Sequence, residues 1–214
     1  MLKVVGSVRN HFMKLILCLL VVWGGQVGFA QTFNGDAVGL SGGCVQVTPN
    51  ATGQAGSVFY PDTLNLNHPF NFLMNFNFGF TNANGADGMV FILQNTGPTE
   101  LGPDGGSLGW FGIPNSLGIE FDTYQNPVND PVFDHISIFR DGTIDHNLPG
   151  HLAGPVPALI GNGNIEDGQD HVVQIMWDPI LQELEVYFDC TQRLSLNINL
   201  VDSIFGGDSL VHWG

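Results

Sequence analysis

Residues 70–80 read FNFLMNFNFGF, and this stretch decides the fold class. A phenylalanine or methionine occupies every second position from Phe70 to Phe80, and asparagine fills most of the positions between them. A period of two is typical of a β-strand with one face in a core and the other face turned to solvent. The stretch therefore predicts an amphipathic strand.

Further strand patterns follow along the chain. GMVFILQN (88–95) is a continuous apolar run, as expected of a strand that is covered on both faces. The later strand candidates are SLGIEF (116–121), HISIF (135–139), HVVQIMW (171–177) and LQELEVYFDC (181–190). The last two flank Asp178-Pro179, a turn dipeptide, and so predict a hairpin. No long window has the period of an α-helix.

Short, glycine-rich connections separate these strands. The 214-residue chain contains 29 glycines, and clusters such as TNANGADG (81–88) lie between the strand patterns. These features predict an all-β fold, an antiparallel two-sheet β-sandwich. Residues 31–214 contain no repeat at a fixed period, so we expect one domain there.

Residues 1–30 have the layout of a secretory signal peptide. Three basic residues precede the apolar run LILCLLVVW (15–23), and small residues lead to a cleavage point expected after Ala30. The segment from Met13 is a complete signal by itself, so Met13 is an alternative start. The apolar run is too short for a stable membrane span. We therefore expect the mature chain, residues 31–214, to be secreted without membrane insertion.

The mature chain is expected to be strongly acidic. Residues 1–30 hold three of the five basic residues and none of the 20 acidic ones, which leaves only Arg140 and Arg193 as basic residues. Such a domain repels nucleic acid and anionic lipid and attracts divalent cations. No nucleic-acid partner is expected.

Two cysteines, Cys44 and Cys190, remain after the signal peptide is removed. In an exported protein a lone pair of cysteines favours a disulfide, which here would tie the start of the domain to its far end. The alternative is two thiols that never meet.

Residues 118–138, GIEFDTYQNPVNDPVFDHISI, gather carboxylates in a stretch that is otherwise largely apolar. Glu120 and Asp122 are two residues apart on a predicted strand, so both side chains point to the same face. Two carboxylates that face a core are very unfavourable unless they are protonated or bound to a cation.

A proline-bounded loop follows these two carboxylates. Asn126 and Asp130 each precede a proline, which predicts a turning loop that returns Asp130 towards the strand, and His135 opens the next strand. Hard oxygen donors suit Ca²⁺, and a mixed carboxylate and imidazole set suits Mn²⁺ or a similar transition ion. The alternative is an acidic surface loop that binds no metal.

Several motifs in this order resemble the legume-type (L-type) lectins, concanavalin A among them. EFDTYQN, then Asp-Pro, then HISI is similar to the metal-binding segment of that family. The other similar motifs are GADGMVFIL (85–93), GGSLGW (105–110) and FGGDSLVHWG (205–214). The resemblance is strongest to the secreted bacterial members. It implies a concanavalin A-like jelly roll whose last strands would follow Gly214, so we expect the chain to be C-terminally truncated.

The resemblance implies two adjacent metal sites. The ligands of a transition-metal ion, usually Mn²⁺, would be Glu120, Asp122, Asp130 and His135. The Ca²⁺ ligands would be Asp122, the backbone carbonyl of Tyr124, the Asn126 side chain and Asp130.

The resemblance also implies a glycan site beside the metals. It would use the carboxylate of Asp87, the backbone N–H of Gly106 and the side chain of Asn126. A carboxylate accepts hydrogen bonds from sugar hydroxyls, and amide groups donate to them. The apolar face of a sugar would lie on the ring of Tyr124. In this family the aspartate follows a cis peptide, here Ala86-Asp87.

The remaining histidines are interpreted more simply. His146, His151, His171 and His212 are expected to be surface or strand-end residues. The resemblance to animal members, some of which have a histidine near the sugar, leaves His146 or His151 as a candidate sugar contact.

Three functions compete. The first is a secreted, Ca²⁺-dependent lectin domain that binds glycans without chemical turnover. The second is a structural or adhesion domain that binds metal but no sugar. The third is a glycoside hydrolase of the same fold, which needs a pair of carboxylates flanking the scissile bond. Related hydrolases have a second glutamate two or three residues after the aspartate. Tyr124 and Gln125 stand there in this chain, so we expect no enzyme.

Overall fold

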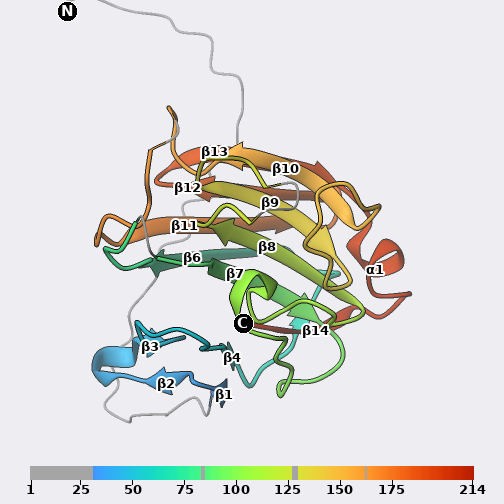
Figure 1. The fold of residues 1–214 in the computed structure, drawn as a ribbon. Helices are drawn as coiled ribbons and strands as arrows, with labels where there is room; N and C mark the ends of the chain where they lie inside the picture. The colour runs from blue at the N-terminus through green and yellow to red at the C-terminus, as the bar shows by residue number, and fades with distance from the viewer. Residues whose placement is uncertain (1–30, 83–84, 127–129, 162) are drawn as a thin grey trace, which may run out of the picture.

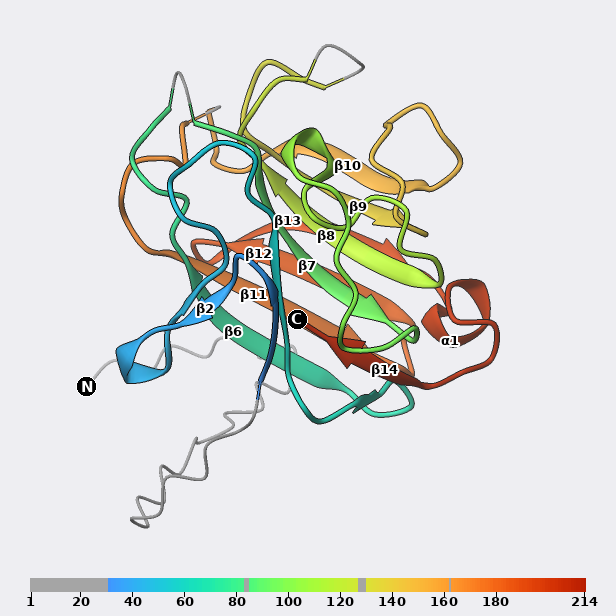
Figure 2. The ribbon, with the colours of Figure 1, turned by 60° about the horizontal axis from the view of Figure 1, so that its bottom comes forward.

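A computed structural model describes residues 31–82, 85–126, 130–161 and 163–214 (Figures 1 and 2). The predicted signal peptide, residues 1–30, lies outside the described residues and stays a prediction. No helix in the described part of the chain has the length and apolar character that crossing a membrane requires.

Two antiparallel sheets form the body of the domain (Figure 1). Their strands are β5 (Leu64–Asn65), β6 (Phe70–Phe76), β7 (Gly88–Gln94), β8 (Ser116–Asp122), β9 (His135–Arg140), β10 (His151–Pro157), β11 (His171–Asp178), β12 (Glu183–Phe188), β13 (Thr191–Asn197) and β14 (Leu210–Trp213). Among the described residues, one sheet has six strands in the order β10-β9-β8-β7-β14-β5, and the other has four in the order β13-β12-β11-β6. The predicted two-sheet antiparallel sandwich is confirmed.

Smaller elements complete the domain. β1 (Thr32–Gly35) pairs with β4 (Gly56–Phe59), and β2 (Val38–Gly39) pairs with β3 (Val45–Gln46); all four lie below the main sheets in the view of Figure 1. The short helical segments are η1 (Ser41–Gly43), η2 (Gly105–Ser107) and α1 (Leu200–Ser203). The segment with η2 supplies Gly106 and Ser107, which line the same pocket as Glu120 and Asp122 of β8.

The stretch that predicts the fold forms β6, but the strand is shorter than its alternating pattern. β6 ends at Phe76, and the Asn77 side chain accepts a hydrogen bond from the N–H of Gly79, which has a positive φ of 78°. This local turn ends the strand although the alternation continues. As a result Phe80 is 79% exposed, whereas the alternating residues within β6 pack against the core.

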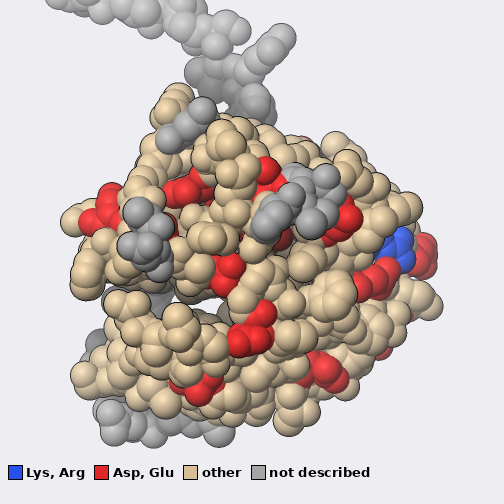
Figure 3. All heavy atoms as spheres, viewed as in Figure 1, with Lys and Arg blue, Asp and Glu red and all other residues tan. Residues whose placement is uncertain are grey.

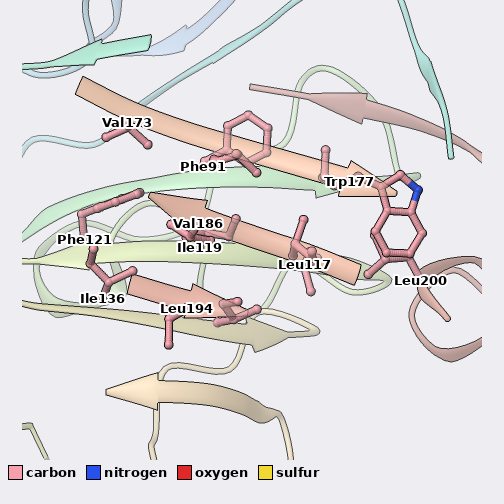
Figure 4. Close-up of a cluster of buried hydrophobic side chains, with 14 of the residues drawn as sticks. Phe91, Leu117, Ile119, Phe121, Ile136, Val173, Trp177, Val186, Leu194 and Leu200 are labelled. Atoms are coloured by element: carbon pink, nitrogen blue, oxygen red, sulfur yellow. The ribbon is translucent and has the colours of Figure 1, made fainter. Parts of the chain in front are cut away.

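The main core fills the space between the two sheets (Figure 4). Ile119 and Phe121 of β8 pack there with Val173 of β11 and Val186 of β12. All four side chains are fully buried. A second, smaller cluster lies on the opposite face of the six-stranded sheet and consists of Phe59, Ile92, Trp110, Ile113 and Phe139. β8 is therefore covered on both faces, and every one of its residues is buried.

The predicted hairpin at Asp178-Pro179 is present. β11 and β12 pair antiparallel in a register that places Asp178 opposite Glu183. The side chain of Asp178 accepts hydrogen bonds from the N–H groups of Ile180 and Leu181, which is how an aspartate stabilises a turn.

The predicted disulfide is not formed in this structure. Cys44 and Cys190 are both free and exposed. Cys44 lies between η1 and β3 in the small hairpin below the sheets, whereas Cys190 lies in the turn between β12 and β13 of the four-stranded sheet. The number and compartment of the cysteines predicted the bridge, but their positions in the fold decide whether it forms.

The core assignment can be tested within one hairpin. Ile175 of β11 is fully buried, and Ile180 in the following turn is 90% exposed. Ile175→Ala should lower the free energy of unfolding by about 2–5 kcal/mol, because it leaves a cavity in the core. Ile180→Ala should change it by less than about 0.5 kcal/mol. Urea denaturation followed by tryptophan fluorescence measures both, and equal effects would contradict the described core.

Candidate functional site

The site begins at the end of β8, where two carboxylates are buried on the face that points away from the main core. Ile119 and Phe121 pack between the sheets, so Glu120 and Asp122 lie on the opposite face. Glu120 is 2% exposed and Asp122 is 4% exposed. Asp122 pairs directly with His135 of β9. The strand period and the register thus bring these two predicted carboxylates and the predicted histidine to one place.

The loop after β8 returns to these carboxylates. The N–H of Tyr124 donates to Oδ1 of Asp122 (2.8 Å), and the N–H of Asn126 donates to Oδ2 of Asp130 (2.9 Å). The Asp130 side chain is 7% exposed. The loop therefore presents Asp130 beside the end of the strand, as its proline-bounded sequence predicts.

A second loop, between β9 and β10, adds His146 to the cluster. Its Nε2 lies 3.2 Å from Nε2 of His135, 3.5 Å from Oδ1 of Asp130 and 3.8 Å from Oε1 of Glu120. The His146 side chain is 7% exposed. The interpretation of His146 as a surface residue is therefore wrong, because the loop folds back over the end of β8.

These side chains form two overlapping groups of candidate metal ligands. One group contains Glu120, His135 and His146, and the other contains Asp122, Asp130 and His135. Within each group the candidate ligand atoms lie within 4.8 Å of one another. Carboxylate and imidazole groups at this spacing are the donors that divalent cations bind.

Burial changes the protonation of this cluster. Desolvation raises the pKa of Asp122 to about 8, and it raises the pKa of Glu120 and of Asp130 above their ordinary values. Burial by itself lowers the pKa of His135, but the close contact with Glu120 and the charges of the nearby carboxylates raise it overall. Burial and the charge of His135 lower the pKa of His146 to about 4. Without a cation, the ionised carboxylates are unfavourable here.

One atom in the cluster tests whether a cation fits. Oε1 of Glu120 is buried and has no hydrogen-bond partner among the described residues. A buried carboxylate oxygen without a partner is strongly unfavourable, and a bound cation would satisfy it. The donor set and this unpaired oxygen therefore fit a divalent metal ion.

Three of the four residues predicted to bind sugar, Asp87, Gly106 and Asn126, lie together beside this cluster. The side chain of Asn126 forms a hydrogen bond with Asp87, and the N–H of Thr123 donates to the carbonyl of Asp87 (2.9 Å). The peptide bond between Ala86 and Asp87 is cis, as the resemblance implies. A Cβ atom on Gly106 would lie 2.8 Å from Oδ1 of Asn126, so only glycine allows this approach.

A pocket of about 320 Å³ connects the two sets of residues. Its lining consists of Gly106, Ser107, Glu120, Asp122, Asn126, Asp130, Ile144 and Asp145. On the face in Figure 3, acidic side chains are spread over the surface and basic ones are confined to one spot at the edge. The pocket therefore offers acceptors for hydroxyl groups and ligands for cations in the same space.

Tyr124, which the sequence predicts to pack on a sugar, is 44% exposed at the surface of the loop, and its N–H donates to Asp122. Two further residues near the site belong to no sequence motif. Asp145 lines the pocket. His146 was missed as a member of the cluster because it follows His135 by 11 residues, outside the strand and loop motif.

A profile of the legume lectin β-barrel domain matches residues 26–214 of this chain. The chain belongs to this family. Among curated relatives, this lectin-family chain is 32% identical to the galactose-binding lectin of Arachis hypogaea over 124 residues, which is 51% of this chain and 45% of that lectin. It is also 32% identical over 129 residues to the pesticidal crystal protein Cry22Aa of Bacillus thuringiensis, covering 60% of this chain and 17% of that protein.

The solved lectin structures support the same fold. The lectin from Bauhinia forficata, in complex with GalNAc, superposes with a TM-score of 0.64 at 20% identity and covers 88% of this chain and 86% of that chain. At this identity the likeness concerns the fold alone. This lectin-family chain spans less than half the length of the two curated relatives named above. A special similarity to bacterial members and a C-terminal truncation stay predictions.

The buried carboxylates predict an unusual pH dependence of stability. Between an ordinary pKa of 3.8 and the folded value of about 8, folded Asp122 holds a proton that the unfolded chain has lost. Raising the pH across this window therefore favours unfolding, by up to about 1.4 kcal/mol per pH unit for each such carboxyl. In EDTA, the free energy of unfolding should fall from pH 5 to pH 8, and Ca²⁺ should reduce this fall because it stabilises the ionised form.

Asp122→Asn is the control for this prediction. Its unfolding in EDTA should depend less steeply on pH, and Ca²⁺ should no longer change the slope. Glu166, whose pKa burial raises to about 7, leaves a smaller dependence of the same sign. Denaturation curves at each pH measure the slopes, and stability that rises with pH in EDTA would contradict the assignment.

Proposed function

We propose that this lectin-family domain is a secreted, Ca²⁺-dependent carbohydrate-binding module that holds glycans without chemical turnover. The observation that carries the proposal is the contact between Asp87, Gly106 and Asn126 beside the carboxylates of β8 and its loop. A carboxylate, a backbone amide and a side-chain amide are the groups that fix the hydroxyls of a sugar.

Each of these residues has a distinct part in binding. The carboxylate of Asp87 would accept hydrogen bonds from two sugar hydroxyls, and the side-chain N–H of Asn126 would donate to one. Gly106 brings its backbone within reach because no side chain separates it from Asn126. The ring of Tyr124, which is 44% exposed, is available to pack against the apolar face of a sugar.

The cation would organise this site rather than contact the sugar. Asp122, Asp130, the Asn126 side chain and the carbonyl of Tyr124 would hold Ca²⁺, which prefers such oxygen ligands and supplies charge compensation for the buried carboxylates. Holding Asn126 and Asp130 together would fix the position of the Asn126 side chain beside Asp87. Metal binding would in this way be coupled to the formation of the sugar site. Glu120 and His135 would complete an adjacent transition-metal site, such as one for Mn²⁺.

The relatives favour galactosides as the first probes. The Arachis hypogaea relative is a galactose-binding lectin, and the Bauhinia forficata structure contains GalNAc. Secretion is proposed from the signal-peptide pattern of residues 1–30. Glycans are the proposed partners, and the acidic surface makes nucleic acid an unfavourable one.

The two other functions have less support. An adhesion domain that binds metal but no sugar would not need the close packing of Asn126 on Gly106. A glycoside hydrolase of this fold would need a second acid beside Glu120 and Asp122, and the following positions hold Tyr124 and Gln125. We therefore propose a binding protein and no enzyme.

Replacement of one carboxylate separates sugar binding from metal binding. Asp87→Asn should weaken galactose binding by at least about tenfold, because a charge-assisted hydrogen bond contributes about 1.5–3 kcal/mol. Ca²⁺ should still raise the melting temperature of this variant, since Asp87 is not among the proposed ligands. Asp62→Asn, at an exposed position, is the matched control. Calorimetric titration with galactose and a glycan array on the Ca²⁺-loaded protein are the measurements.

Different failures of this experiment have different meanings. If EDTA and Ca²⁺ leave the melting temperature of the wild-type protein unchanged, the metal part of the proposal is wrong. If Ca²⁺ stabilises the protein but no glycan binds, the adhesion alternative is favoured. Equal binding by wild type and Asp87→Asn would remove Asp87 from the site.

Gly106→Ala tests the packing of the site. The added methyl group would meet the Asn126 side chain at 2.8 Å, so that side chain must shift from its position beside Asp87. We expect galactose affinity to fall by about tenfold or more, which corresponds to 1.4 kcal/mol. Ca²⁺ should still stabilise the variant, but less than the wild-type protein, because Asp122 and Asp130 are unchanged while the side chain of Asn126, a proposed Ca²⁺ ligand, is displaced. Unaltered galactose affinity would contradict the role of Gly106.

A further inference from the structure

His146 reaches the metal-binding cluster from a part of the chain that supplies none of the other candidate ligands. Its Nε2 is 3.2 Å from Nε2 of His135 and 3.8 Å from Oε1 of Glu120, and these last two atoms are 3.4 Å apart. In a tetrahedral zinc site with bonds of 2.0–2.1 Å, neighbouring ligand atoms are separated by about 3.3 Å. The three atoms therefore form a triangle close to one face of such a site.

The loop that carries His146 is held in place by its neighbours. The His146 ring packs against Phe139, with ring centroids 5.1 Å apart, and meets the His151 ring edge-on at 4.9 Å. Nδ1 of His151 lies 3.1 Å from the carbonyl oxygen of His146, and its Nε2 lies 3.1 Å from the carbonyl oxygen of Ala153. His151 thus bridges the loop to β10 and fixes the direction of His146.

One further observation fits a cation at this position. Oε1 of Glu120, on a side chain that is 2% exposed, lies 3.4 Å from Nε2 of His135 and 3.8 Å from Nε2 of His146, and it forms no hydrogen bond with another described residue. A bound cation would satisfy this buried oxygen.

We propose that His146 is a direct protein ligand of the transition-metal position, which becomes a site of Glu120, His135 and His146 with the Asp122 and Asp130 carboxylates beside it. A second imidazole shifts the preference of the site from Mn²⁺, which favours oxygen ligands, towards Zn²⁺. Two histidines and one glutamate are a donor set found in zinc proteins. The inference rests on the metal part of the proposed function but is independent of sugar binding.

The competing explanation is a hydrogen bond between the two imidazoles, with one ring donating to the other. In that arrangement His146 would support His135 and never contact the ion. Zn²⁺ binds most sites more tightly than Mn²⁺ whatever the ligands. The informative quantity is therefore the change in affinity for each ion when His146 is removed.

The test compares Zn²⁺, Mn²⁺ and Ca²⁺ affinities of the full chain, His146→Gln and His68→Gln by competition with a chromophoric chelator. Loss of a residue that only supports a ligand lowers metal affinity by about 10- to 100-fold. Loss of a direct ligand should therefore weaken Zn²⁺ binding by at least about 100-fold, with a smaller change for Mn²⁺ and little for Ca²⁺. His68 is an exposed histidine outside the cluster, so its replacement should leave all three affinities unchanged.

A measurement on the wild-type protein avoids dependence on how the variant folds. In the Co²⁺-loaded protein, proton NMR should show two strongly shifted imidazole N–H signals, one each for His135 and His146. A single such signal, or a Zn²⁺ affinity that His146→Gln leaves unchanged, would overturn the proposal. Neither result would contradict the proposed function. That function is tested separately, by Ca²⁺-dependent stabilisation and by galactose binding.

Discussion

The burial of two carboxylates on one face of β8 is the constraint on which the rest of the site depends. β8 is buried along its whole length, and its other face forms the centre of the main core. Glu120 and Asp122 therefore cannot turn to solvent without removing Ile119 and Phe121 from that core. The ionised carboxylates must be protonated or compensated where they are. The surrounding loops supply the groups that make compensation possible.

The core, the candidate metal ligands and the residues proposed to bind sugar are linked through short contacts in this arrangement. The loop after β8 joins Asp122 to Tyr124 and Asp130 to Asn126, and the side chain of Asn126 continues to Asp87. A cation that draws Asp122 and Asp130 together would therefore also position Asn126. The same strand that stabilises the sandwich thus places the candidate binding residues at its end, so a rigid sheet supports a candidate site built largely on loops.

Parts of the fold and site could be read from the sequence because they depend on local geometry. The alternation in residues 70–80 gives a strand, and the spacing of Glu120 and Asp122 places both on one face, whatever the rest of the chain does. The end of β6 at Phe76 was not readable from alternation, because the turn formed by Asn77 competes with it. The two cysteines led to a wrong expectation for a similar reason. Their number and the expected export of the protein give no information about the distance between Cys44 and Cys190 in the fold.

The sequence by itself determined the strand pattern, the acidic character and the group of Glu120, Asp122, Asp130 and His135, because period, composition and proline position act over a few residues. Only the tertiary structure decided that His146 joins this group and that Asn126 packs on Gly106. Those contacts join separate loops, and the folding back of one loop onto another depends on packing against Phe139 and β10 rather than on any local pattern. The composition of the candidate metal site is therefore a property of the assembled sheet and its loops together.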